Sequence, residues 1–138
     1  MSRQFPAVRA LCLALALGVP GLAPQPARAQ GTFAVNSTLD GADANPGNGV
    51  CETSPGNGMC TLRAAIQETN ALPGADAIIL PAGTYTLSIA GVDEDASATG
   101  DLDILGDLTI TGAGAATTII DAGGLDRVFQ VGFPSAIT

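Results

Sequence analysis

Residues 77–138 predict an all-β fold, built as the first coils of a parallel β-helix. Leu87, Ile110 and Phe129 recur at intervals of about 20 residues, which is the scale of one coil in such a fold. Few hairpin dipeptides separate the later strands, which favours parallel coils, although strands this short could also build an antiparallel sandwich. The expected strands are β-rich runs between glycine-rich turns, at 78–80, 84–89, 102–105, 108–111, 118–121 and 128–131.

A short strand, a polar loop and a short helix are expected before this domain. Residues 32–36 alternate like a strand, and residues 37–48 are rich in Gly, Asp, Asn and Pro, which is typical of a loop. Thr61 is the expected N-cap of a helix that ends near Asn70, before the Pro73-Gly74 turn. The helical spacing predicts a solvent face with Gln67 and Glu68, opposite a core face of Leu62, Ala65, Ile66 and Thr69.

The N-terminal segment, at 1–29, has the features of a secretory signal peptide. Arg3 and Arg9 precede a short apolar run at 10–19, and Ala27-Arg28-Ala29 supplies a small-x-small cleavage pattern. The run is too short to cross a bilayer, which takes about 20 residues. We therefore expect Sec-type export with cleavage after Ala29, and a protein that is secreted or displayed at the cell surface.

Two cysteines remain after that cleavage, Cys51 and Cys60. An even pair in an exported chain predicts a disulfide, which would close a short loop. A metal site is the competing interpretation, but two thiols without histidine make a poor ligand set.

The exported chain is strongly acidic. All 13 Asp and Glu residues lie beyond Ala29, where only Arg63 and Arg127 are basic, so its formal net charge is −11. Such a surface repels nucleic acid and anionic lipid, and we expect neither as a partner.

The residues Cys60-Thr61-Leu62-Arg63-Ala64-Ala65 resemble the CSLREA motif, which names a domain at the N-terminus of large exported bacterial proteins. The surrounding sequence is similar as well, at 45–51, 66–71, 78–85 and 100–104. The chain departs from the motif at Thr61 and at Ala64, where the motif has Glu, and this loss argues against an acid function at that position. Residues 108–129 are similar to the opening coils of right-handed, pectate-lyase-like (pectin-lyase-like) β-helices.

Taken with the resemblance, these observations divide the chain into three segments: the signal peptide at 1–29, a capping region with its disulfide loop and helix at 30–76, and the first β-helix coils at 77–138. Coils need several stacked neighbours, so we expect the chain to be a fragment of a longer protein. The implied role is structural or adhesive, with a cell-surface polysaccharide or another surface protein as partner. The alternative is the N-terminal part of a polysaccharide lyase or glycoside hydrolase whose active site lies beyond Thr138.

The acidic cluster at 93–103 offers the best candidates for chemistry. Asp93, Asp95, Asp101 and Asp103 are weak calcium candidates, because carboxylates in a flexible loop suit that ion. An EF-hand is not predicted, since its glycine and its final glutamate are both missing from the pattern. Asp101 and Asp103 could also form the carboxylate pair of a glycoside hydrolase, but a solvated acidic loop is the simpler interpretation.

Three other side chains have structural expectations. Arg63 is expected to bond loop carbonyls and Arg127 to pair with a nearby carboxylate, while Tyr85 should pack on the first coil. No catalytic residue is assigned, and no cofactor is predicted apart from the calcium candidates.

Overall fold

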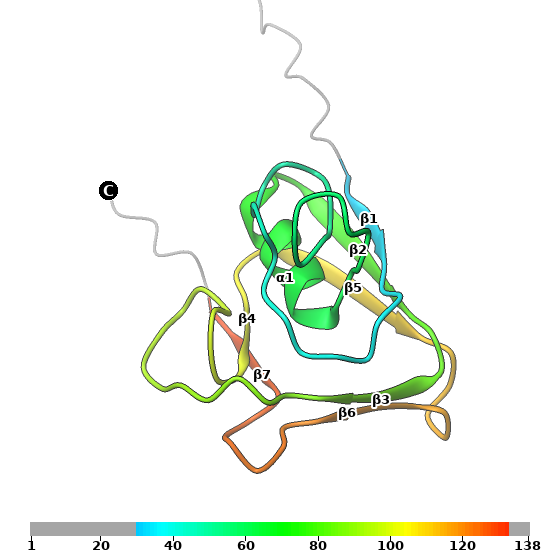
Figure 1. Cartoon of the computed structure of the whole chain (residues 1–138), viewed down its shortest axis with the longest axis vertical. Helices are drawn as coiled ribbons and strands as arrows, with labels where there is room; N and C mark the ends of the chain where they lie inside the picture. The colour runs from blue at the N-terminus through cyan, green and yellow to red at the C-terminus, as the bar shows by residue number, and fades with distance from the viewer. Residues whose placement is uncertain (1–29, 133–138) are drawn as a thin grey trace, which may run out of the picture.

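The computed structural model describes residues 30–132, which form one helix and seven strands (Figure 1). The expected signal peptide and residues 133–138 lie outside the described residues. All six strands expected from residue 77 onward are present, with ends shifted by a few positions. In chain order the elements are β1 (Thr32–Ala34), α1 (Leu62–Ala71), β2 (Ala75–Leu80), β3 (Gly83–Thr86), β4 (Leu102–Ile104), β5 (Asp107–Gly112), β6 (Thr118–Asp121) and β7 (Phe129–Val131).

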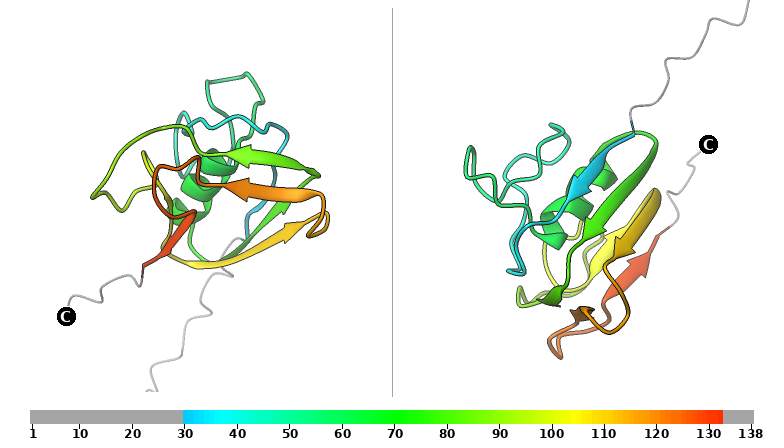
Figure 2. Two further views of the ribbon diagram at one scale, coloured as in Figure 1. Left: turned by 90° about the horizontal axis from the view of Figure 1, so that it is seen from below. Right: turned by 90° about the vertical axis from the view of Figure 1, so that its right-hand side faces the viewer.

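The strands pair in parallel and form three small sheets. One sheet has the order β1-β2-β5, the second pairs β3 with β6, and the third pairs β4 with β7. β2, β3 and β4 therefore each take a partner from β5, β6 and β7, in the same order along the chain (Figure 2). Every pairing within residues 30–132 is parallel, so the antiparallel sandwich is wrong for this part of the chain.

The repeat length taken from the apolar spacing is also wrong. Ala75 pairs with Asp107, Gly83 with Thr118, and Leu102 with Phe129, so the paired strands lie further apart in the chain than expected, and by unequal lengths. The lengths are unequal because the connections differ, above all the long loop at 87–101 between β3 and β4. Ile110 pairs with Ile78, not with Leu87.

The core lies between α1 and the first three strands after it. Apolar side chains at alternate positions of these strands are at most 4% exposed, and α1 contacts both β2 and β4. Four apolar side chains of β5–β7 pack against this core and are only partly buried: Leu108, Ile110, Ile120 and Phe129. The buried core set is Phe33, Val35, Cys60, Leu62, Ala65, Ile66, Ile78, Leu80, Tyr85, Leu87 and Leu102.

α1 has no solvent face, which corrects the sequence prediction. Gln67 is 8% exposed and Glu68 is fully buried, and Arg63 on the same helix is also fully buried. The expected apolar face is buried as predicted. The segments before the helix and the loop at 87–101 account for the difference, because their backbones contact the polar side chains of the helix.

The disulfide between Cys51 and Cys60 is present, with the two Cα atoms 5.0 Å apart. It closes the loop that leads into α1, as the cysteine count predicted. Within residues 30–132 no helix is long and apolar enough to cross a membrane.

Candidate functional site

Residues 61–70 and Asp40 contain a cluster of polar side chains, most of them buried, which we call the helix hub. Each member bonds to the backbone or a carboxylate of another segment of the chain. A short helix forms here because Thr61 caps it: its Oγ1 accepts the N–H of Ala64 at 3.1 Å. The hub consists of Thr61, Arg63, Gln67, Glu68 and Asn70 together with Asp40.

Arg63 uses all of its N–H donors. Its Nε and Nη2 bond the two carboxylate oxygens of Asp40 at 2.6 and 3.1 Å. The remaining donors bond three backbone carbonyls, those of Ser97 at 3.0 Å, Gly100 at 2.8 Å and Asp101 at 3.4 Å. The prediction of loop carbonyl bonding is confirmed, although the loop is the one before β4 and not the cysteine loop. With its donors saturated and its side chain at 0% exposure, Arg63 has no contact left for a substrate.

Asp40 completes this buried ion pair. Its Oδ2 also accepts the N–H groups of Ser88 and Ile89, at 2.7 and 3.0 Å. Burial by itself would raise the pKa of Asp40, but the bonds from Arg63 and the two N–H groups outweigh it and hold the pKa below its ordinary value. Asp40 is therefore an anion that ties the N-terminal segment, α1 and the loop after β3 together.

Gln67 and Glu68 fix the two loops on either side of the helix. The Gln67 amide accepts the N–H of Asp43 at 2.7 Å and donates to the carbonyl of Ser97 at 3.1 Å. The two oxygens of Glu68 accept the N–H groups of Gly47 and Gly49, both at 3.0 Å. Burial raises the pKa of Glu68 above its ordinary value, and these N–H bonds offset part of the rise.

Thr61 and Asn70 act at the two ends of the helix. Thr61 Oγ1 donates to the carbonyl of Gly41 at 2.5 Å. Asn70 bridges the strand below it, because its amide donates to the carbonyl of Asp103 at 2.7 Å and accepts the N–H of Leu105 at 3.0 Å. Together with the other members of the hub, they join three regions of the chain to α1: residues 40–49, the loop at 87–101, and β4.

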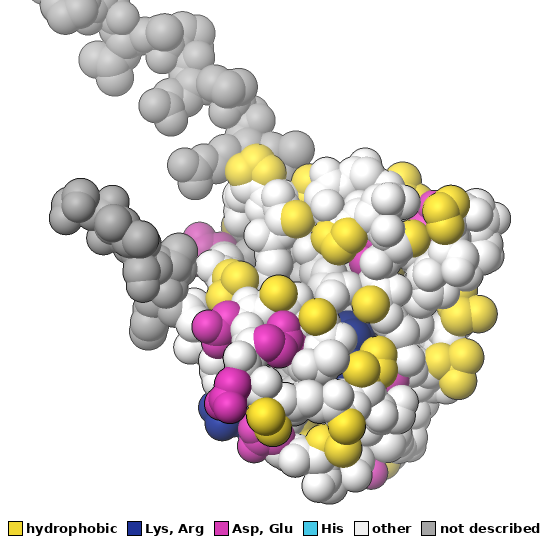
Figure 3. Space-filling view, turned by 60° about the vertical axis from the view of Figure 1, so that its left-hand side comes forward, with side chains coloured by type: hydrophobic (Ala, Val, Ile, Leu, Met, Phe, Trp, Pro, Cys, Tyr) yellow, Lys and Arg dark blue, Asp and Glu magenta, His cyan; other side chains and the backbone are white. Residues whose placement is uncertain are grey.

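The side chains of the acidic cluster at 93–103 do not converge on one point, and those that are bonded have different partners. Glu94 accepts the N–H groups of Ala96 and Thr99, and Asp95 accepts the amide of Gln130 at 2.9 Å. Asp93 is exposed. In Figure 3 several acidic side chains gather on the same face as exposed apolar ones. Within residues 30–132 no three Asp, Glu, Cys or His side chains are placed to hold a metal ion.

Asp103 is the most unusual carboxylate of the cluster. It is 1% exposed; its Oδ2 accepts the N–H of Ser97 at 3.0 Å, and its Oδ1 has no partner among the described residues. Burial raises the pKa of Asp103, the Ser97 bond opposes that rise, and nearby carboxylates including Asp101 add to it. The Ser97 hydroxyl also bonds the N–H and the carbonyl of Asp103, at 2.7 and 3.0 Å, so this residue anchors the loop to β4.

The remaining predicted residues lie at the surface or in the core. The guanidinium of Arg127 pairs with Asp101 at 3.6 Å and with Asp126 at 3.5 Å, and its side chain is 55% exposed, which confirms its expected pairing. Tyr85 is buried in the first set of strands, as expected, and donates its hydroxyl to the carbonyl of Pro81 at 2.9 Å. Asp101 and Asp103 lie at the start of β4, and one carboxylate oxygen of each, Oδ2 of Asp101 and Oδ1 of Asp103, has no hydrogen-bond partner among the described residues.

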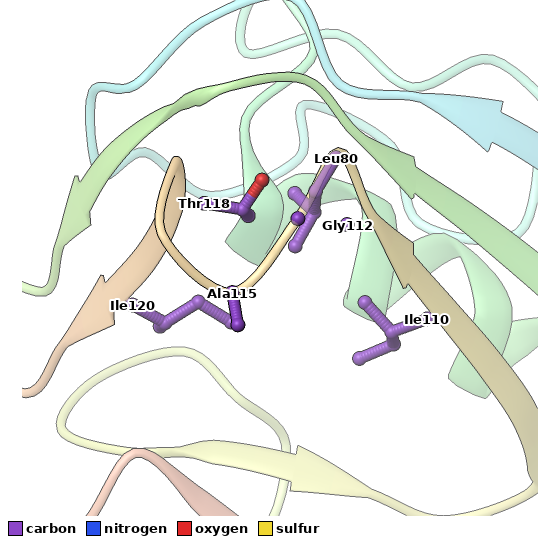
Figure 4. Close-up of a pocket in the computed structure, with 7 residues that line it drawn as sticks. Leu80, Ile110, Gly112, Ala115, Thr118 and Ile120 are labelled. Atoms are coloured by element: carbon purple, nitrogen blue, oxygen red, sulfur yellow. The ribbon is translucent and has the colours of Figure 1, made fainter.

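Hollows open to solvent among the described residues include the following two. One, of about 310 Å³, lies at the C-terminal end of α1 beside the acidic loop, where Gln67, Asn70 and Asp95 contribute side chains already bonded elsewhere. The other, of about 250 Å³, is mainly apolar and lies beside β5 and β6 (Figure 4).

Comparison with known proteins gives no assignment: no family model, no curated protein and no solved structure matches the chain.

Sequence reasoning missed Asp40 and misplaced Gln67 and Glu68. Asp40 lies in a polar loop well before Arg63 in the chain, and nothing in its neighbourhood indicates a buried ion pair. The only available signal was the density of polar residues in a helix too short to be stable alone.

Proposed function

We propose that this chain carries a CSLREA-type cap at the N-terminal end of a right-handed parallel β-helix, in an exported protein with a structural or adhesive role. In this proposal β2, β3 and β4 are the first coil, β5, β6 and β7 are the second, and α1 closes the end above the first coil.

One observation carries this proposal: burial differs between the two sets of strands. The apolar side chains of the first set, such as Ile78 and Leu102, are fully buried between α1 and the second set. Their paired residues in the second set, Ile110 and Phe129, are only partly buried. A cap on one side and a stacking surface on the other would produce this gradient, because each coil buries its apolar face against its neighbours.

The chemistry of the helix hub supports a structural role. Arg63 and Asp40 hold loops and have no free donors or acceptors directed at an opening. The disulfide fits an oxidising compartment, in which an exported protein would retain it. An acidic exterior suits a surface protein that must stay soluble.

The cap can be tested by fusing residues 30–138 ahead of a well-characterised parallel β-helix whose own N-terminal cap has been deleted. We expect the fusion to be monomeric and to melt cooperatively, while the uncapped protein aggregates through its exposed first coil. The matched control is the same fusion with Asp40→Ala, which should aggregate as the uncapped protein does. A wild-type fusion that aggregates as strongly as the uncapped protein would refute the proposal.

The absence of catalysis can be tested directly on the exported chain. Incubation with a panel of acidic and neutral polysaccharides should release neither reducing ends nor unsaturated sugar products. Turnover that survives purification and is lost in Asp101→Asn or Asp103→Asn would replace the structural role with an enzymatic one.

A further inference from the structure

The segment that precedes α1 contains the same short sequence twice. Pro-Gly-Asn-Gly, followed by one apolar residue and a cysteine of the disulfide, stands at 46–51 and again at 55–60. The central asparagines, Asn48 and Asn57, are both exposed, and of the five asparagines in the chain they alone precede glycine. The two copies therefore form a matched pair that differs mainly in its folded surroundings.

An asparagine followed by glycine can react with its own backbone, which makes this step chemically labile. The amide nitrogen of the glycine loses its proton and attacks Cγ of the asparagine; a C–N bond forms, and the side-chain nitrogen leaves as ammonia. Water then opens the cyclic imide. Cleavage between the nitrogen and Cγ gives aspartate, and cleavage between the nitrogen and the backbone carbonyl carbon gives isoaspartate, so water is the only co-reactant. Glycine favours the attack because it has no Cβ to crowd its nitrogen.

The attacked carbonyl group is held alike in the two copies. In each, Oδ1 of the asparagine accepts the N–H of the residue two positions on, at 2.7 Å for Asn48 and 2.9 Å for Asn57. Negative charge develops on Oδ1 during the attack, so this N–H stabilises the reacting state in both copies. The glycines are alike as well: φ is 82° at Gly49 and 63° at Gly58, and a Cβ at either would meet no other part of the chain within 4 Å.

The attacking nitrogens differ. Gly49 donates its N–H to Oε2 of the fully buried Glu68 at 3.0 Å, whereas the N–H of Gly58 has no partner among the described residues. Removing the proton of Gly49 would break a bond to a charged group and place a second negative charge beside the carboxylate of Glu68. Gly58 has no such penalty. Thr53 also orients the second copy, because its Oγ1 accepts from Nδ2 of Asn57 at 2.9 Å and so keeps Oδ1 turned toward its N–H donor.

We propose that Asn57 is a site of spontaneous modification, where the chain converts its own asparagine to aspartate and isoaspartate, while Glu68 protects Asn48 from the same reaction. The product adds a negative charge and, as isoaspartate, a backbone carbon inside the loop that the disulfide closes. None of the hub contacts described above involves residues 52–59, so the modification leaves them in place. This inference does not rest on the cap proposed above.

Peptide mass spectrometry of the exported chain, residues 30–138, during incubation at mildly alkaline pH tests the proposal. After reduction of the disulfide, cleavage at Glu52 separates the two copies, so the mass gain from amide to acid is assigned to each asparagine. We expect Asn57 to be modified at least ~10-fold faster than Asn48, because breaking a hydrogen bond to a charged group costs about that factor. The control is the same chain, reduced and unfolded in urea, in which the two rates should be similar because the local sequences match.

Glu68→Gln separates protection by the carboxylate from general rigidity of the loop. The variant removes the charge beside Gly49, so modification of Asn48 should become faster while that of Asn57 stays unchanged, with the fold checked by circular dichroism. An unchanged rate at Asn48 in the folded variant would overturn the protection by Glu68. Equal rates at Asn48 and Asn57 in the folded wild-type chain would overturn the proposal even if the variant does not fold. A folded wild-type chain in which neither asparagine reacts, while both react in urea, would overturn it as well.

Discussion

Replacing Asp40 by alanine should destabilise the protein far more than replacing a surface residue. Asp40→Ala leaves the fully buried guanidinium of Arg63 with three carbonyls and no counter-charge, and it removes the acceptor for two backbone N–H groups. Breaking a buried ion pair by removing one partner costs about 3–5 kcal/mol. The free energy of unfolding of a domain of this size is about 5–15 kcal/mol, so the variant should still fold but should unfold at a measurably lower denaturant concentration.

The assay is urea-induced unfolding followed by far-UV circular dichroism, with the disulfide intact. Arg127→Met is the matched control: this arginine also pairs with aspartates but is 55% exposed, so its loss should cost no more than about 1 kcal/mol. The double variant Asp40→Ala with Arg63→Met should be less destabilised than the sum of the two single changes, because it removes both charges together. If Asp40→Ala costs as little as Arg127→Met, the assignment of a structural hub is refuted.

Three further predictions concern the disulfide, a carboxyl group and a turn. Cys51→Ser with Cys60→Ser should lower the free energy of unfolding by roughly 2.5–3 kcal/mol, and equal urea midpoints for the variant and the wild type would contradict this. The pKa of Asp103 is raised in the folded state, so the contribution of this carboxyl group to stability should fall as the pH rises from the ordinary pKa near 3.8 through the folded pKa. Urea midpoints measured across pH should show this fall, and Asp103→Asn should flatten it. Gly123→Ala should destabilise by about 1–3 kcal/mol more than Gly124→Ala in thermal melts. Both glycines have positive φ, but only at Gly123 would a Cβ collide with a backbone carbonyl oxygen, that of Leu87, and equal melting temperatures would exclude that clash.

The helix and its cysteine loop show how far sequence reasoning extended into the candidate site. Thr61 as N-cap and the pairing of Cys51 with Cys60 were both predicted, because each depends on a few residues that are close in the chain. The solvent face assigned to Gln67 and Glu68 was wrong, because helical periodicity reports which side chains are apolar and not which loops cover the others.

The strands were also predicted only in part: their positions were predicted correctly, but their pairing was not. Short β-rich runs between glycines located all six strands from residue 77 onward, since alternation and turn residues are local signals. The repeat length was wrong, because it was taken from the spacing of three apolar residues, and Leu87 and Phe129 both lie outside the sheet that contains Ile110. Connections of unequal length separate the paired strands, and no local signal fixes which strand lies beside which.

The sequence by itself determined the places of the strands, the capped start of the helix, the disulfide pair and the acidic charge, all of which follow from residue type and close spacing. Only the tertiary structure decided the parallel pairing of the strands, the burial of the helix on every side, and the ion pair between Asp40 and Arg63. The physical reason is that these features depend on contacts between segments far apart in the chain, in which a buried polar group must find a partner from a distant segment.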